Sequence, residues 1–198
     1  MLATPSSVTA SLVARRCPAA AERLAAIGYA SVVFVALAFR REDVTVDPGA
    51  SGVLVPRGSG PRITAVSWSS NKWGHRPDTP FLARAALGHV GDPDAVDLSD
   101  DRLLDATRAD LSSIAAITAE PLDVRISRFR DAFPQYRPGH LDRTTEIERA
   151  LSVDLPNVVV CGMAHRGVGI PTCVREARTA ASELWRRLTT DRGPGAAA

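Results

Sequence analysis

The chain has 198 residues, 45% of them hydrophobic and 23% charged, which is typical of a soluble globular protein with one large domain or two small ones. The formal net charge is +2, from 24 Lys and Arg against 22 Asp and Glu, and without a basic stripe this balance does not favour a nucleic-acid partner. Cys17, Cys161 and Cys173 form no CxxC pair and the four histidines lack metal-ligand spacing, so we predict neither a disulfide framework nor a metal site.

The longest apolar run, Tyr29–Phe39, is too short to cross a bilayer, which takes about 20 residues. We expect it to be a buried strand and predict no transmembrane segment. Arg15 and Arg16 follow the first apolar residues instead of preceding them, so the beginning does not resemble a signal peptide. These features favour a cytoplasmic protein and leave peripheral attachment to a membrane open.

The first thirty residues predict a strand end and two helices. Leu2–Pro5 has the character of a strand end, and the sequence offers it no evident partner. Ser6 or Ser7 is expected to cap a helix that runs to about Arg16. A second helix follows Pro18 and is expected to end at Gly28.

The middle of the chain predicts four strands, one helix and then a further strand. Ser99 precedes two aspartates and apolar residues at helical spacing, so it is expected to be a helix N-cap. The predicted strands are Tyr29–Phe39, which is expected to be central, Gly52–Pro56, Ile63–Ser69, Phe81–Gly88 and the alternating Pro121–Arg130. Ile63–Ser69 is expected to pair with Gly52–Pro56 as a hairpin and with Phe81–Gly88.

The last third predicts a strand, a glycine-rich turn and a helix. The apolar strand is Asn157–Cys161, and the helix starts near Pro171 and continues to Leu188. A strand that enters a helix through glycines presents unpaired N–H groups at the positive end of the helix dipole, which suits a phosphate or an electron-rich ring edge. The alternative is an ordinary strand-to-helix turn.

These elements predict a mixed α/β (α+β) fold with two lobes. Residues 1–28 and 131–190 form one lobe, with helices across strands from near the two ends. Residues 29–130 form the other, with a mixed or antiparallel sheet and helices, and residues 191–198 are expected to be a flexible tail.

Two motifs in register identify a resemblance. The first is Phe133–His140, FPQYRPGH, and the second is GVGIPTC at Gly167–Cys173, which follows an apolar strand and Gly162. Together with LATP at Leu2–Pro5 and further segments, they resemble the oxygen-dependent porphyrinogen oxidases, flavoproteins of haem synthesis in the flavin amine oxidase superfamily. The match extends to about Leu188. The GxGxxG fingerprint of the family's N-terminal half is absent, so the chain resembles only the C-terminal half.

The resemblance implies FAD as cofactor and implies the residues that contact it. Gly162 would allow close approach of the backbone, and Val168, Gly169 and Ile170 would turn their N–H groups toward the flavin pyrimidine edge. Phe129 stands where relatives often have a tryptophan near the flavin, although a role as an ordinary core aromatic residue is at least as well supported. No catalytic residue is assigned, and His140 is expected to fix its own loop.

The implied function is oxidation of coproporphyrinogen III or protoporphyrinogen IX to the porphyrin, with O₂ reduced to H₂O₂, and the residues do not decide between the two substrates. One alternative is an inactive fragment or a split-protein half that works with a separate N-terminal half. Another is an amine oxidase or desaturase relative. Glu176 departs from the small residue usual in the last helix, and His89 departs from a usual glycine.

Overall fold

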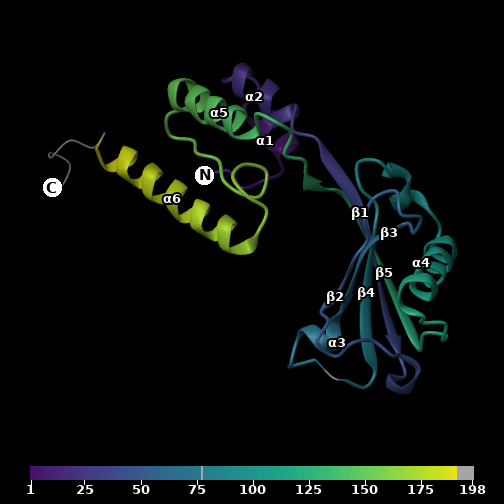
Figure 1. Ribbon diagram of the computed structural model, residues 1–198. Helices are drawn as coiled ribbons and strands as arrows, with labels where there is room; N and C mark the ends of the chain where they lie inside the picture. The colour runs from purple at the N-terminus through teal and green to yellow at the C-terminus, as the bar shows by residue number, and fades with distance from the viewer. Residues whose placement is uncertain (77, 191–198) are drawn as a thin grey trace. The chain divides into compact units, whose positions relative to one another are not determined.

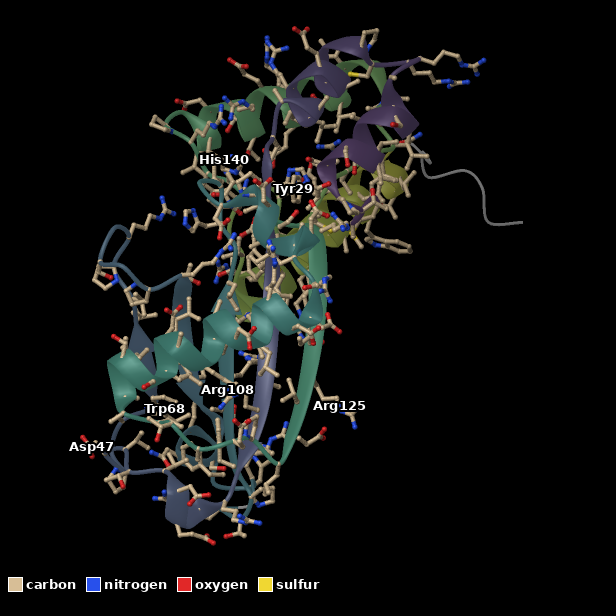
Figure 2. The ribbon with its side chains drawn as sticks, turned by 90° about the vertical axis from the view of Figure 1, so that its right-hand side faces the viewer. Tyr29, Asp47, Trp68, Arg108, Arg125 and His140 are labelled. Carbon is tan, nitrogen blue, oxygen red and sulfur yellow. The ribbon has the colours of Figure 1, made fainter. Side chains whose placement is uncertain are left out.

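The computed structural model describes residues 1–76 and 78–190, and the chain divides into two units (Figure 1). The first unit is Met1–Tyr29 with the described residues from Pro134 onward, and the second is Ala30–Phe133. The chain leaves the first unit at Tyr29, which Figure 2 labels, and returns at Pro134. The described part contains a five-stranded antiparallel sheet and six α-helices, so the expected mixed α/β class is correct. The expected tail 191–198 lies outside the described residues.

The first unit is built from helices around a small apolar core. The helices are α1 (Ser6–Val13), α2 (Pro18–Ala25), α5 (His140–Asp154) and α6 (Ile170–Thr190). The core gathers apolar side chains from α1, α2, α5 and the segment before α6. It consists of Ala10, Val13, Cys17, Ala20, Ala21, Leu24, Ile27, Ile147, Leu151 and Val160.

The start of the chain has a partner. Leu2 and Val160 form a parallel bridge, in which Leu2 N–H donates to Val159 O at 2.8 Å and Cys161 N–H donates to Leu2 O at 3.0 Å. The expected strand Asn157–Cys161 is therefore wrong in extent, because Leu2 alone lies beside it and only Val160 is bridged. The bridge joins the two chain segments that make up the first unit.

Two predicted helix ends are wrong. Pro5 occupies the N-cap of α1, and Ser6 is already helical without a side-chain cap bond. The hydroxyl of Tyr29 accepts the Ser6 N–H at 3.0 Å, so a distant residue satisfies one of the groups a serine cap would have satisfied. Helix α2 ends at Ala25, and its C-cap residue Ala26 has right-handed α-helical backbone angles. The expected cap Gly28 lies beyond this end, and its carbonyl oxygen accepts the Gln135 N–H at 2.9 Å.

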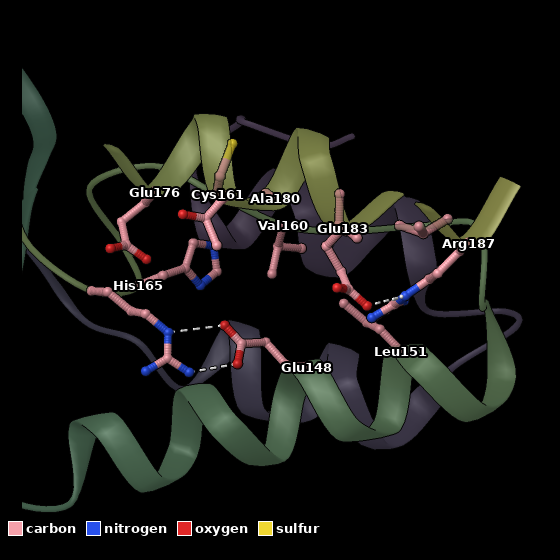
Figure 3. A pocket seen from close by; sticks show the side chains of 13 residues that line it. Glu148, Leu151, Val160, Cys161, His165, Glu176, Ala180, Glu183 and Arg187 are labelled. Atoms are coloured by element: carbon pink, nitrogen blue, oxygen red, sulfur yellow. Dashed lines mark hydrogen bonds and ion pairs between the residues drawn. The ribbon is translucent and has the colours of Figure 1, made fainter. Parts of the chain in front are cut away.

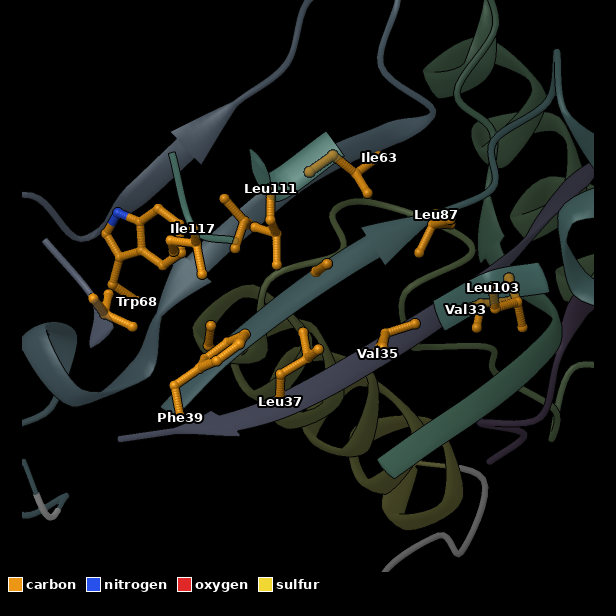
Figure 4. Packing of buried hydrophobic residues seen from close by; sticks show 14 of the residues in the cluster. Val33, Val35, Leu37, Phe39, Ile63, Trp68, Leu87, Leu103, Leu111 and Ile117 are labelled. Atoms are coloured by element: carbon orange, nitrogen blue, oxygen red, sulfur yellow. The ribbon is translucent and has the colours of Figure 1, made fainter. Parts of the chain in front are cut away.

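The second unit is a sheet covered on one face by α4 (Asp100–Ala115). Alternate side chains of β1, from Val33 to Phe39, pack with Leu103 and Leu111 of α4 (Figure 4). The strand order is β2-β3-β4-β1-β5, so β1 is internal, as predicted. The strands are β1 (Tyr29–Phe39), β2 (Gly52–Leu54), β3 (Ile63–Trp68), β4 (Phe81–Leu87) and β5 (Asp123–Pro134).

Short helices and polar contacts complete this unit. The short helices are α3 (Ser69–Lys72) and the 3-10 helices η1 (Arg41–Asp43) and η2 (Pro93–Asp97). Ser99 caps α4 as predicted, because its hydroxyl accepts the Arg102 N–H. One carboxylate oxygen of Asp110 accepts the N–H groups of Arg62 and Ile63 at 2.7 and 2.8 Å, which ties α4 to β3.

Candidate functional site

The loop from Gly162 to Gly169 leads into α6 and carries most of the predicted site. Gly162 has φ +112°, and a side chain there would face open space, with the nearest atom, Ala3 O, at 3.9 Å. Gly167 has φ +149°, and a Cβ there would come within 2.6 Å of the Thr172 methyl group. Glycine at 167 therefore forms the turn, whereas glycine at 162 leaves backbone open to a ligand.

Val168, Gly169 and Ile170 stand exposed at the start of α6. The side chains of Val168 and Ile170 are 49% and 80% exposed. No described group accepts a hydrogen bond from the N–H of Val168, Gly169 or Ile170. The first helical bond runs from Cys173 N–H to Gly169 O at 2.9 Å, and the Cys173 thiol donates to Gly167 O at 3.4 Å. The loop thus presents N–H donors at the positive end of a 21-residue helix.

The segment Pro134–His140 supports this loop directly. The Tyr136 hydroxyl donates to Met163 O at 2.5 Å, and His140 Nε2 bonds to His165 O at 2.6 Å. The two rings stack with centroids 3.9 Å apart, and burial raises the pKa of Tyr136. Gly139 is the N-cap of α5 and has φ +76°. His140 therefore has a structural role, as expected, but it fixes the loop before α6 and not the Pro134–His140 segment to which it belongs.

Behind the loop, α5 and α6 enclose a cavity of about 340 Å³ with apolar and charged walls (Figure 3). Arg166 pairs with both oxygens of Glu148 at 3.1 and 2.5 Å, which raises the pKa of Arg166. His165 is 3% exposed, and neither of its ring nitrogens has a partner among the described residues. Burial lowers the pKa of His165 to about 4, so its ring is neutral at pH 7. Glu176 also lines this cavity.

Phe129 belongs to the second unit, where its ring meets Phe34 edge to face at 5.7 Å. The four residues predicted together, Gly162 and Val168–Ile170, share one loop of the first unit. In the same unit, the Arg128 side chain donates hydrogen bonds to Val96 O and Leu98 O and forms an ion pair with Asp100.

Sequence reasoning missed a second hollow, on the sheet of the second unit. It has about the same volume, 340 Å³, and is lined by side chains of β1, β3, β4 and β5 and by α3 with the residues after it. Its cations are Lys72, Arg76, Arg84 and Arg125. The available signal was the run Tyr29–Phe39, which is apolar on both faces although α4 covers only one.

Within residues 1–76 and 78–190, no group of three His, Cys, Asp or Glu side chains is arranged to hold a metal ion. None of the helices in that part of the chain combines the length and apolar character needed to span a membrane.

Comparison with known proteins gives one family and several named relatives. Residues 1–184 match the family described as flavin containing amine oxidoreductase. The coproporphyrinogen III oxidase of Mycobacterium leprae (strain TN) is 41% identical over 172 residues, 87% of this chain and 36% of that protein. The protein of the same name from Bacillus subtilis (strain 168) is 36% identical over 154 residues, 77% of this chain and 33% of that protein.

A solved structure described as a protoporphyrinogen oxidase, from Exiguobacterium sp. 255-15, superposes with a TM-score of 0.78 at 30% identity. The match covers 95% of this chain and 40% of that one. The chain therefore spans little more than a third of the length of these relatives.

Proposed function

Since the chain belongs to the flavin containing amine oxidoreductase family, we propose that it supplies part of a porphyrinogen oxidase of haem biosynthesis. In this proposal the first unit contributes one wall of an FAD site, and the second unit contributes the substrate lobe. The names of the relatives support coproporphyrinogen III as the substrate, with coproporphyrin III as the product.

The observation that carries the proposal is the exposed start of α6, with its three unpaired N–H groups, braced by Tyr136 and His140. N–H donors at a helix N-terminus fit the electron-rich edge of a flavin ring, and the open backbone of Gly162 fits a planar group in close contact. When bound, FAD would supply the oxidation chemistry, with O₂ as the acceptor and H₂O₂ as the product. The N–H groups of Val168, Gly169 and Ile170 would orient the ring and stabilise negative charge on it.

Glu176 is compatible with this role. A carboxylate beside the flavin would destabilise the negatively charged reduced form. Glu176, however, lines the cavity between α5 and α6, and Arg166 lines the same cavity. Arg166 lies in the loop before α6, and its positive charge interacts with the carboxylates of Glu148 and Glu176. The cofactor-facing residues Val168–Ile170 do not line that cavity.

About two thirds of the length of each relative lies outside the match. We therefore propose that the FAD site is completed by an N-terminal half similar to theirs. The chain alone is then expected to retain no FAD. The alternatives are an inactive piece and another flavin amine oxidase relative.

A chimera tests the proposal. The matched region of the Mycobacterium leprae coproporphyrinogen III oxidase is replaced by this chain, and the purified product is examined for flavin absorbance. We expect bound flavin and a rise of porphyrin fluorescence on addition of coproporphyrinogen III. The unmodified relative and this chain alone serve as controls. Bound FAD without any gain in porphyrin fluorescence would count against a porphyrinogen substrate, and a yellow 198-residue chain would remove the need for a second half.

A further inference from the structure

The sheet of the second unit has an apolar face that α4 does not cover. In β1 the side chains alternate, so Val35 and Leu37 pack in the α4 core while Ala36 and Ala38 face the other way. Ala36 lies opposite Arg84 of β4, and Arg84 lies opposite Ser67 of β3. Small side chains at the centre of this face leave room for a flat body.

This face is hollowed into a groove with a basic rim. Its walls carry four cations, Lys72, Arg76, Arg84 and Arg125, and one carboxylate, Asp123. The groove thus has a net charge of +3, although the whole chain has only +2. Arg125 projects from the edge strand β5 (Figure 2). Such a concentration of charge attracts anions into the groove.

Among the described residues, three of the four groove cations lack a carboxylate partner, whereas five other arginines of the unit have one. Arg41, Arg62, Arg108, Arg128 and Arg130 each form an ion pair with an aspartate or glutamate. No described carboxylate pairs with Lys72, Arg76 or Arg84. Arg84 instead lies over the Phe34 ring at 4.7 Å, and Lys72 lies over Trp73 at 5.5 Å. Arg125 meets Asp123 only at 3.5 Å, with its own side chain 81% exposed.

We propose that this groove anchors the carboxylates of a flat, apolar polycarboxylate, with Arg84 as the central anchoring residue. The apolar floor of Ala36, Ala38 and Leu82 takes the edge of the ring body. The guanidinium of Arg84 is held in place by Phe34 and keeps its N–H donors for a carboxylate. For a porphyrinogen, the bound groups are its propionates, so this inference rests on the proposed function for the identity of the ligand.

Direct binding to the full 198-residue chain tests the groove. Coproporphyrin III, the stable oxidised form of the substrate, is titrated and followed by its fluorescence. We expect Arg84→Gln to weaken binding by roughly threefold to tenfold, since one charge-assisted bond is lost in a partly solvated site. Arg57→Gln is the matched control, because Arg57 is an exposed arginine of the same unit outside the groove, and it should leave the affinity unchanged.

Two further measurements separate anchoring from folding and from apolar adsorption. Arg125→Gln should also weaken binding. Because the Arg125 side chain is exposed, this substitution should not disturb folding, and weaker binding would then reflect the lost charge. Coproporphyrin tetramethyl ester, which has no carboxylates, should bind much more weakly than the acid. Equal affinities of the Arg84→Gln and Arg57→Gln chains, or of ester and acid, would overturn the proposal.

A second ligand distinguishes this proposal from the proposed function. Pyrene tetracarboxylate is flat and polyanionic but is not a tetrapyrrole. If it binds in an Arg84-dependent manner while coproporphyrin III does not bind, the groove is supported and the porphyrinogen function fails. If coproporphyrin III binds equally well to the Arg84→Gln chain, the groove fails and the function survives. Binding to neither, with Arg84-dependent sedimentation on phosphatidylglycerol vesicles, would replace the proposal with a lipid-surface role.

Discussion

His140 Nε2 donates to the backbone carbonyl oxygen of His165 over 2.6 Å, and so joins two segments that are 25 residues apart. A carbonyl oxygen only accepts, so Nε2 carries the ring proton. Tyr136 stacks on the same imidazole and donates to Met163 O. The segment Pro134–His140 therefore fixes the loop whose far end presents the N–H groups of the candidate site.

This support predicts the result of two conservative substitutions. His140→Phe keeps the stack but leaves His165 O with only the Thr144 hydroxyl at 3.3 Å, so we expect a loss of about 1–2 kcal/mol in unfolding free energy. Tyr136→Phe should cost about 0.5–1.5 kcal/mol, because only one hydroxyl is lost. Urea unfolding followed by circular dichroism measures both, and faster amide exchange at residues 163–169 is expected. His75→Phe, at an exposed position, is the control, and equality with it would contradict the bracing role.

Local signals were sufficient for most strands of the second unit, although β5 runs from Asp123 to Pro134 and so extends beyond the predicted end at Arg130. Tyr29–Phe39 is a strand with the predicted bounds, and the hairpin partners Gly52–Leu54 and Ile63–Trp68 pair as expected. Phe81–Leu87 pairs with β3, as predicted, and also with β1. These elements follow from apolar periodicity and turn residues close in sequence, which a single strand or hairpin contains in full.

Distant partners explain what sequence reasoning missed. The bridge between Leu2 and Val160 and the Tyr29 hydroxyl that accepts the Ser6 N–H both depend on residues far apart in sequence. The cations of the groove come from β4, from β5 and from α3 with the residues after it, and no spacing reveals that they share a face. The loop residues Gly162 and Val168–Ile170 remain predictions, and they rest on a sequence motif and not on a periodicity.

The N-cap of α4 gives a simple test of local stability. The Ser99 hydroxyl accepts the Arg102 N–H, so Ser99→Ala should lower the unfolding free energy by about 1 kcal/mol. Ser112→Ala, in the same helix with an exposed side chain, should change it by less than about 0.5 kcal/mol. Thermal unfolding of the two variants in parallel measures the difference. A Ser99→Ala chain as stable as the Ser112→Ala chain would show that the cap bond contributes nothing.

Acid should destabilise the chain through His165. Burial lowers its pKa from 6.5 to about 4, so the unfolded chain binds a proton more readily than the folded one. The stability due to neutral His165 is full above pH 6.5 and is lost as the pH falls toward 4, by up to about 3 kcal/mol. His165→Phe should flatten the pH dependence of urea unfolding between pH 7 and 4.5, whereas His75→Gln should leave it unchanged. An unaltered slope in the His165→Phe chain would exclude this assignment.

The two glycines of the GVG turn should separate stability from cofactor binding. Gly167→Ala places a Cβ within 2.6 Å of Thr172 at φ +149°, so we expect a loss of about 2 kcal/mol or more. A Cβ at Gly169 meets only the Pro171 ring, at 3.9 Å, and Gly169→Val should change the unfolding free energy by less than about 1 kcal/mol. In the chimera with the Mycobacterium leprae relative, however, the valine would crowd the N–H groups offered to the flavin. We expect it to lower FAD affinity roughly tenfold, equivalent to about 1.4 kcal/mol. Full flavin retention by a stable Gly169→Val chimera would remove this loop from the cofactor site.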